Sequence, residues 1–284
     1  METSPLARRL ATRFVAGETP AEALDVVRRL NSEGITVTLD HLGESVTTRE
    51  EAAAARDVYL GVLDSLHRAG LEVNVSLKLS QFGIDISYDE CLANVGQLVR
   101  RAAELGGYIR VDMESSAYTQ KTLDLVADLH ARHGSVGVVV QAYMRRSHSD
   151  VEFLNSRRIR VRLCKGAYLE PPSVAFPEKS EVDRSYFELA QLLLDGGVYP
   201  ALATHDEALI ARIEQFAAAR KIARDAFEFQ MLYGIRRDLQ RRLVKDGYRM
   251  RVYVPFGRAW YPYYMRRLAE RPANVFFILR NLFR

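Results

Sequence analysis

The sequence predicts an α/β fold: a (βα)8 barrel of the TIM type, preceded by an N-terminal helical extension. Short runs rich in β-branched and apolar residues alternate with helical segments along the chain. Eight such strand–helix units fit into about 250 residues, the usual size of a (βα)8 barrel. A doubly wound sheet is the alternative, but no GxGxxG loop follows the first predicted strand, where such a sheet would carry it.

The extension covers residues 1–34 and the barrel covers residues 35–284. Thr19 is the expected N-cap of the extension's helix, with Pro20 at the first helical position and Glu22 as the capping glutamate. This helix is expected to run to about Leu30, and Gly34 ends it before the first strand.

The first half of the barrel is expected to contain four strand–helix units. A capping box is expected at Thr47–Glu50 and an N-cap at Ser87, before the second and third helices of the chain. The predicted strands span 35–40, 72–78, 108–114 and 136–142, and the helices span 47–70, 87–106 and 117–133, with a short helix near Asp150.

The second half is expected to repeat the same alternation. A proline-rich loop separates the fifth strand from its helix, and the last helix ends before Pro272. The predicted strands span 158–165, 200–205, 226–232 and 250–254, and the complete helices span 181–194, 207–219 and 237–245.

Composition is that of an ordinary globular protein, with 48% hydrophobic and 27% charged residues. The net charge of +4 is small and both signs are interspersed, which argues against a nucleic-acid partner. No apolar run approaches the roughly 20 residues of a spanning helix. Cys91 and Cys164 form no metal-binding pattern and the six histidines are scattered, so we expect a reduced, cytoplasmic protein without a metal site.

Polar side chains recur at the carboxyl ends of the predicted strands, which is where barrel enzymes carry their active sites. Any one of them alone is more often a helix cap or a charge partner. Together they predict a functional mouth of mixed charge that suits an anionic ligand. The strand-end set is Asp40, Lys78, Asp112, Glu114, Gln141, Arg162, Lys165, Thr204, His205, Gln230 and Tyr253.

The adjacent arginines Arg266 and Arg267 follow a tyrosine-rich turn, and two guanidinium groups can hold a carboxylate or phosphate by forked hydrogen bonds. Two other functions remain open from the residues alone. Lys78 or Lys165 would form a Schiff base in a lyase. A non-catalytic nucleic-acid-binding barrel is less favoured, because the cations lie at strand ends rather than in one stripe.

Several motifs are more specific in combination. They are LDHLGE (39–44), SLKLS (76–80), DME (112–114), VRLCKGAY (161–168), ATH (203–205) and EFQMLYG (228–234), followed by the segment 253–274. In this order, each at a strand end, they resemble the proline dehydrogenases, flavin-dependent barrel enzymes that are also found fused in bacterial proline utilisation A. The resemblance covers about residues 35–274.

The resemblance implies roles for individual residues. Asp112 and Arg162 are expected to be catalytic, and Arg162 to lie near flavin N5, while Glu44 is expected to pair with Arg266 when the site closes. L-proline is expected to bind Lys78, Leu232, Tyr253, Tyr263, Arg266 and Arg267. FAD is expected to bind Met113, Gln141, Arg162, Lys165, Gly166, Ala167, Tyr168, Thr204 and His205.

The implied reaction oxidises L-proline to Δ1-pyrroline-5-carboxylate by hydride transfer to FAD N5, with electrons passed to a quinone. That acceptor implies transient contact of a cytoplasmic protein with the inner face of the membrane; the oligomeric state is left open. Two departures from the family pattern are present. Cys164 replaces a plain apolar residue and is expected to be inert packing. The segment 257–264 is shorter than in the fused enzymes, so the substrate lid is expected to differ.

Overall fold

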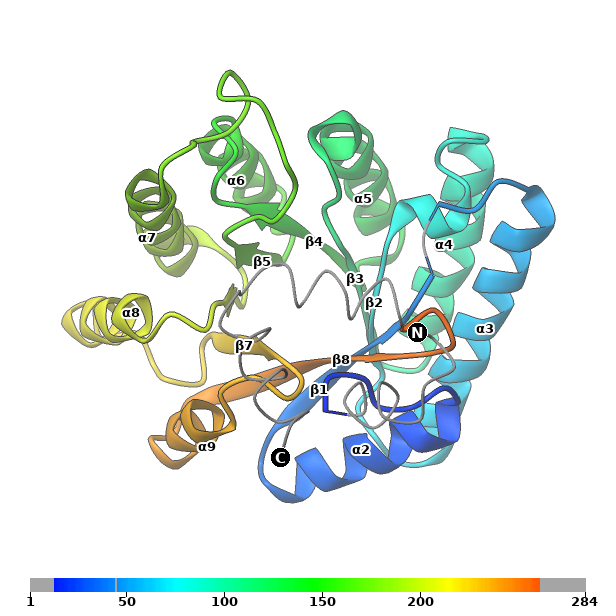
Figure 1. The fold of residues 1–284 in the computed structure, drawn as a ribbon, viewed down its shortest axis with the longest axis horizontal. Helices are drawn as coiled ribbons and strands as arrows, with labels where there is room; N and C mark the ends of the chain where they lie inside the picture. The colour runs from blue at the N-terminus through cyan, green and yellow to red at the C-terminus, as the bar shows by residue number, and fades with distance from the viewer. Residues whose placement is uncertain (1–12, 44, 261–284) are drawn as a thin grey trace, which may run out of the picture.

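Eight strands form one closed barrel in the computed structural model, which describes residues 13–43 and 45–260 (Figure 1). Each strand is parallel to both neighbours, and β8 closes the barrel against β1. The predicted barrel class is therefore confirmed. The strands are β1 (Thr36–His41), β2 (Asn74–Leu77), β3 (Tyr108–Val111), β4 (Val136–Gln141), β5 (Val161–Cys164), β6 (Ala201–Ala203), β7 (Glu228–Leu232) and β8 (Arg249–Phe256).

Helices surround the barrel, as Figure 1 shows. Two short 3-10 turns, η1 (Leu79–Phe82) and η2 (Ser116–Tyr118), follow β2 and β3. The helices are α2 (Pro20–Ser32), α3 (Arg49–Arg68), α4 (Tyr88–Glu104), α5 (Thr119–His133), α6 (Ser147–Ser156), α7 (Lys179–Gly196), α8 (Glu207–Ala219) and α9 (Arg237–Lys245). In the described part of the chain, no helix is both long enough and apolar enough to cross a membrane.

Local sequence signals explain the element boundaries. The capping box of Thr19 and Glu22 is confirmed, and Ser87 caps α4. The expected box at 47–50 is wrong by one residue. Thr48 caps α3 and Glu51 closes the box, because the Glu51 carboxylate accepts from the backbone nitrogens of both Thr47 and Thr48.

The fifth strand is shorter than the predicted range of 158–165. It begins at Val161, because Arg158 adopts a positive φ of 56°, a left-handed conformation that ends α6 and is incompatible with a strand. Within the described residues the other predicted strands and helices are present, with ends that differ by a few residues. The last predicted helix, which ends before Pro272, lies outside the described residues and stays a prediction.

Side-chain alternation divides each strand between two environments. In β1, Val37 and Leu39 belong to the hydrophobic core between sheet and helices, whereas Thr38 and Asp40 contact other polar side chains inside the barrel. The same core cluster runs from Ala16 and the residues of α2 through to β8. The predicted division between an extension and a barrel at residue 34 stays a prediction.

The barrel interior near the amino-terminal ends of the strands is ionic. Arg251, 6% exposed, donates from Nε to both carboxylate oxygens of Glu228 at 3.0 and 3.1 Å. Its Nη atoms donate to Glu72 at 2.9 and 3.1 Å. Burial opposes ionisation of Glu228, but the charge and hydrogen bonds of Arg251 outweigh it and lower the pKa of this carboxyl. Gln230 donates to Glu228, so its side-chain amide belongs to this ionic group at the amino-terminal ends rather than to the mouth.

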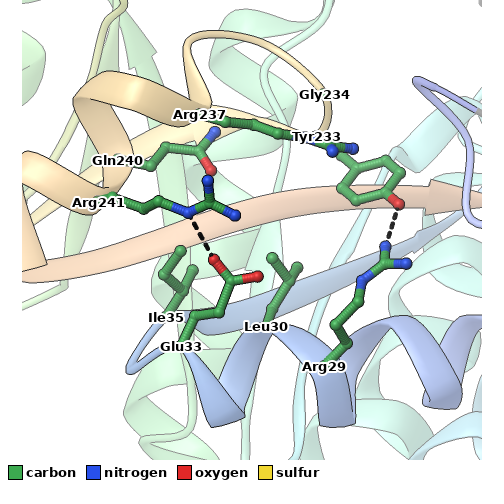
Figure 2. Close-up of a pocket in the computed structure, with 9 residues that line it drawn as sticks. All are labelled: Arg29, Leu30, Glu33, Ile35, Tyr233, Gly234, Arg237, Gln240 and Arg241. Atoms are coloured by element: carbon green, nitrogen blue, oxygen red, sulfur yellow. Dashed lines mark hydrogen bonds and ion pairs between the residues drawn. The ribbon is translucent and has the colours of Figure 1, made fainter.

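A small cavity separates α2 from the β7–α9 connection (Figure 2). Across it, Arg29 Nη2 donates to the Tyr233 hydroxyl at 2.5 Å, and Arg241 Nε donates to Glu33 Oε2 at 2.8 Å. The described residues that line the cavity are distinct from the predicted strand-end set, so we interpret these bonds as attaching α2 to the barrel.

Candidate active site

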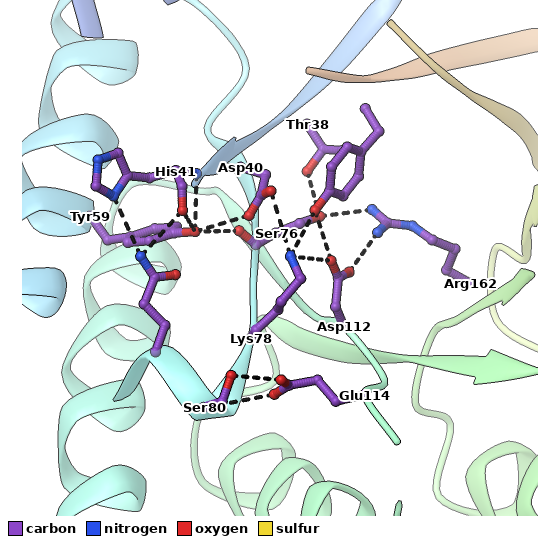
Figure 3. Close-up of polar contacts among 12 residues, drawn as sticks. Thr38, Asp40, His41, Tyr59, Ser76, Lys78, Ser80, Asp112, Glu114 and Arg162 are labelled. Atoms are coloured by element: carbon purple, nitrogen blue, oxygen red, sulfur yellow. Dashed lines mark hydrogen bonds and ion pairs between the residues drawn. The ribbon is translucent and has the colours of Figure 1, made fainter. Parts of the chain in front are cut away.

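The Asp112 carboxylate, just after β3, joins three strands at the carboxyl-terminal mouth (Figure 3). Its Oδ1 accepts from Arg162 Nη1 on β5 at 2.9 Å, and its Oδ2 accepts from the Tyr253 hydroxyl on β8 at 2.8 Å. The Arg162 guanidinium also lies over the Tyr253 ring, 5.3 Å from its centroid. Three residues that are distant in sequence therefore form one charge-assisted cluster.

Lys78, just after β2, places its ammonium among three oxygens of this cluster. Nζ lies 3.6 Å from Asp40 Oδ2, 3.7 Å from Asp112 Oδ2 and 3.5 Å from the Tyr253 hydroxyl. These distances exceed the 2.7–2.9 Å or so of a direct ammonium–carboxylate bond. Two carboxylates nevertheless lie within ion-pair distance of Nζ, which argues against Lys78 as a Schiff-base nucleophile.

Tyr59 of α3 supports the cluster from the helix layer, a role that no sequence pattern indicated. Its hydroxyl donates to the Ser76 carbonyl at 2.8 Å, accepts from His41 N at 3.1 Å and lies 3.3 Å from Asp40 Oδ1. Burial, with a smaller effect from the Asp40 charge, raises the pKa of Tyr59 well above its ordinary value. The side chain is therefore a neutral support for the carboxylate beside Lys78.

Two further residues that sequence reasoning missed lie beneath the mouth. The Thr38 and Ser76 hydroxyls are 3.0 Å apart, and Ser76 Oγ accepts from Arg162 Nη2 at 2.9 Å. Both alternate in sequence with apolar residues, and each stands two positions before a predicted site residue, Asp40 or Lys78. Residues two apart on a strand point to the same side, so this spacing could have identified Thr38 and Ser76 as inward-facing.

Glu114, Gln141 and Met113 lie together beside the cluster. The Glu114 carboxylate accepts from Ser80 N at 3.0 Å and Ser80 Oγ at 2.6 Å, which ties the end of β3 to η1. Gln141 Nε2 donates to the Glu114 carbonyl at 2.9 Å, and Met113 is buried. We interpret Glu114 as a structural anchor, while Gln141 and Met113 stay predicted FAD contacts.

Lys165 lies toward the edge of the mouth. Its Nζ pairs with Asp183 of α7 at 2.5 Å and with Asp206, the N-cap of α8, at 2.9 Å. Asp206 N in turn donates to Thr204 Oγ1 at 3.1 Å. Ion pairs with two carboxylates engage the Lys165 nitrogen at the edge of the mouth, so it is also a poor Schiff-base candidate.

The loop after Lys165 follows a constrained path. Gly166 has a φ of +111°, and a Cβ at this position would lie 2.2 Å from the Tyr143 ring, so a glycine is required. Glu170 fixes the far side of the loop, accepting from Ser116 N and Oγ at 2.6 Å each. Tyr168 is 39% exposed between these two anchors. Ala167 lies in the same loop.

His205 binds the backbone of Leu232, another of the predicted site residues. Its Nε2 accepts from Leu232 N at 3.0 Å, which assigns the ring proton to Nδ1 in the neutral tautomer. Of the remaining predicted residues, Glu44, Tyr263, Arg266 and Arg267 lie outside the described residues.

One feature of the described residues suits a flavin. Among them, Arg162 Nε is buried without a hydrogen-bond partner, so a donor remains for a bound acceptor. Burial raises the pKa of Cys164 to about 12, in agreement with inert packing. Within 13–43 and 45–260, no cluster of His, Cys, Asp or Glu side chains could hold a metal ion.

A closed (βα)8 barrel with an ionisable cluster at the carboxyl ends of its strands has the architecture of a barrel enzyme. The family model described as proline dehydrogenase matches residues 23–280. Proline dehydrogenase of Deinococcus radiodurans is 42% identical over 280 residues, which cover 96% of this chain and 90% of that protein. Proline dehydrogenase 2 of Bacillus subtilis is 41% identical over 272 residues, with the same coverage of both chains.

A solved structure of proline utilization A from Bdellovibrio bacteriovorus, inactivated by N-propargylglycine, superimposes with a TM-score of 0.85 at 28% identity. The match covers 91% of this chain and 32% of that one, so this chain spans about a third of the longer protein. The chain belongs to the proline dehydrogenase family, and it is an oxidoreductase. The family predicted from the strand-end motifs is confirmed.

Proposed function

We propose that this chain oxidises L-proline to Δ1-pyrroline-5-carboxylate with FAD as cofactor and a quinone as the final electron acceptor. The observation that carries the proposal is the cluster of Asp112, Arg162, Tyr253 and Lys78 at the barrel mouth. When bound, FAD supplies a hydride acceptor at N5 for the proline carbon next to nitrogen.

The charge balance of the cluster indicates that residues outside it bind the substrate carboxylate. Lys78 and Arg162 are balanced by Asp40 and Asp112, so the cluster has no excess positive charge for a substrate carboxylate. The adjacent Arg266–Arg267 pair would supply that charge through forked hydrogen bonds, with Lys78 as a nearby cation. Tyr253, Tyr263 and Leu232 would pack against the pyrrolidine ring, and Glu44 would pair with Arg266 on closure.

The chain's own groups would position the substrate and stabilise the reduced cofactor. Anchoring the carboxylate positions the reacting carbon, and the neutral amine supplies the lone pair that forms the C=N bond as the hydride leaves. The protonated imine then loses its proton to solvent. Arg162 would stabilise the electron-rich reduced ring. FAD would be held by Met113, Gln141, Arg162, Lys165, Gly166, Ala167, Tyr168, Thr204 and His205.

The deciding experiment is a visible spectrum of the purified protein supplied with FAD, followed by L-proline without oxygen. We expect flavin bands that bleach on addition of L-proline and persist with D-proline. A protein that binds no flavin would refute the proposal. Flavin that binds but stays oxidised with L-proline would retain the cofactor and refute the substrate.

We further propose that the quinone is reached by transient contact with the inner face of the membrane. The measurement is proline-dependent reduction of a quinone carried in vesicles, compared with a water-soluble quinone analogue. Turnover with the soluble analogue but none with vesicles would contradict the membrane part of the proposal and leave the quinone part standing.

A further inference from the structure

Three buried polar groups connect β1, β2 and β5 beneath the mouth, as Figure 3 shows for the labelled Thr38, Ser76 and Arg162. The two hydroxyls lie 3.0 Å apart, and Arg162 Nη2 donates to Ser76 Oγ at 2.9 Å. Thr38 and Ser76 have no exposed surface, and Arg162 is 5% exposed.

Hydrogen-bond chemistry determines the direction of the first contact. A guanidinium has donors and no acceptor, so Ser76 Oγ must accept from Arg162. A second bond to Thr38 then fixes the Ser76 hydroxyl, whichever of the two hydroxyls donates. Ser76 is consequently a pre-oriented acceptor on a different strand from the Arg162 backbone.

Two acceptors on separate supports determine how the guanidinium lies. Asp112 Oδ1 holds Nη1 at 2.9 Å, while Ser76 holds Nη2 at the same distance. With Asp112 alone, the planar group could pivot about that single bond. With both, its plane is set, and Nε is the guanidinium nitrogen left without a hydrogen-bond partner among the described residues.

We propose that Ser76, backed by Thr38, is a positioning residue that orients Arg162 and thereby raises the reduction potential of the bound flavin. The inference rests on the proposed function, in which Arg162 lies near flavin N5. A fixed positive charge favours the electron-rich reduced ring over the oxidised ring. A guanidinium free to pivot would provide less of this stabilisation.

The test measures the flavin reduction potential of the FAD-loaded protein with redox dyes, without proline turnover. We expect Ser76→Ala to shift the equilibrium about tenfold toward oxidised flavin, which is about 30 mV for a two-electron couple. Thr38→Val, close to the native shape, should give a smaller shift in the same direction. Thr38→Ser, which keeps a hydroxyl, should restore the wild-type value.

Thr36→Val is the matched control, because Thr36 lies on the same strand and its hydroxyl donates to the Met250 carbonyl at 3.1 Å. It should leave the potential unchanged. Wild-type potentials in both Ser76→Ala and Thr38→Val would overturn the positioning role. Where Ser76→Ala does not fold, a wild-type potential in Thr38→Val would overturn it. A wild-type protein that binds no flavin would refute the proposed function itself, and this inference with it.

Discussion

Replacement of Tyr253 by phenylalanine tests whether the cluster acts as a unit. The change removes one hydroxyl, which donates to Asp112 Oδ2 at 2.8 Å and lies 3.5 Å from Lys78 Nζ. A hydrogen bond to a charged group contributes about 1.5–3 kcal/mol. Arg162 still holds the other Asp112 oxygen, so we expect the lower part of that range, about 1.5–2 kcal/mol. This corresponds to about a 10- to 30-fold loss in kcat/KM for L-proline.

The assay is the initial rate of proline-dependent dye reduction, measured across pH. Burial, followed by the charges of Asp112 and Asp40, raises the pKa of Tyr253 well above 10. The hydroxyl therefore stays protonated below pH 10, and the loss in Tyr253→Phe should be constant from neutral pH to that value. A loss that shrinks as pH rises toward 10 would show that this hydroxyl titrates.

Tyr118→Phe is the matched control, since its hydroxyl donates to Asp85 Oδ2 at 2.7 Å in an exposed setting. It should retain wild-type kcat/KM. A change of less than threefold in Tyr253→Phe, or an equal loss in the control, would refute the reasoning.

Three other perturbations are informative, two of them drawn from the structure and the third, at Arg266, from the sequence. Glu228→Gln leaves buried Arg251 without its buried carboxylate partner and should cost about 3 kcal/mol in urea unfolding at pH 7. Because the pKa of Glu228 is lowered below 4.5, its contribution to the free energy of unfolding is complete above pH 4.5 and declines as pH falls through the folded-state pKa. The loss of stability in Glu228→Gln should therefore shrink at low pH. A loss that does not change with pH would contradict this account. Gly166→Ala should weaken FAD binding at least tenfold in a titration, with unchanged circular dichroism, because its Cβ would strike Tyr143; unchanged affinity would contradict the assigned loop constraint. Arg266→Ala should lose about 2–4 kcal/mol of transition-state stabilisation in kcat/KM while retaining flavin, and unchanged turnover would remove the carboxylate clamp.

Much of the fold was predictable, because strand and helix signals are local. The cap at Thr19 and the apolar alternation of β1 are each contained in a few residues. Strand-end residues could also be assigned to one mouth, since parallel strands of a barrel present their carboxyl ends together. The capping error at Thr47 shows the limit: two adjacent threonines satisfy the same pattern, and only the reach of Glu51 distinguishes them.

The pairings within the site were not predictable from local patterns. Arg162 binds Asp112 across 50 residues, and Tyr253 binds the same carboxylate across 141 residues. These contacts depend on barrel register and side-chain direction. Tyr59 occupies a buried helical position that is typical of core packing, and its polar role depends on the distance between α3 and β1. Ser76 resembles an ordinary strand residue until Arg162 is placed beside it.

The pairing of β1 with β8 has a consequence for synthesis of the protein. Thr36 pairs with Arg251 and His41 with Phe256, and the Thr36 hydroxyl donates to a carbonyl 214 residues away. At about 5–20 residues per second, β8 is translated about 10–40 seconds after β1. Until then, the nascent strands form at most an open parallel sheet with unpaired edges at β1 and β7, which expose backbone donors and acceptors to other chains. Closure of this barrel is therefore a late event on the ribosome, and the interval before it is when the chain is most vulnerable to aggregation.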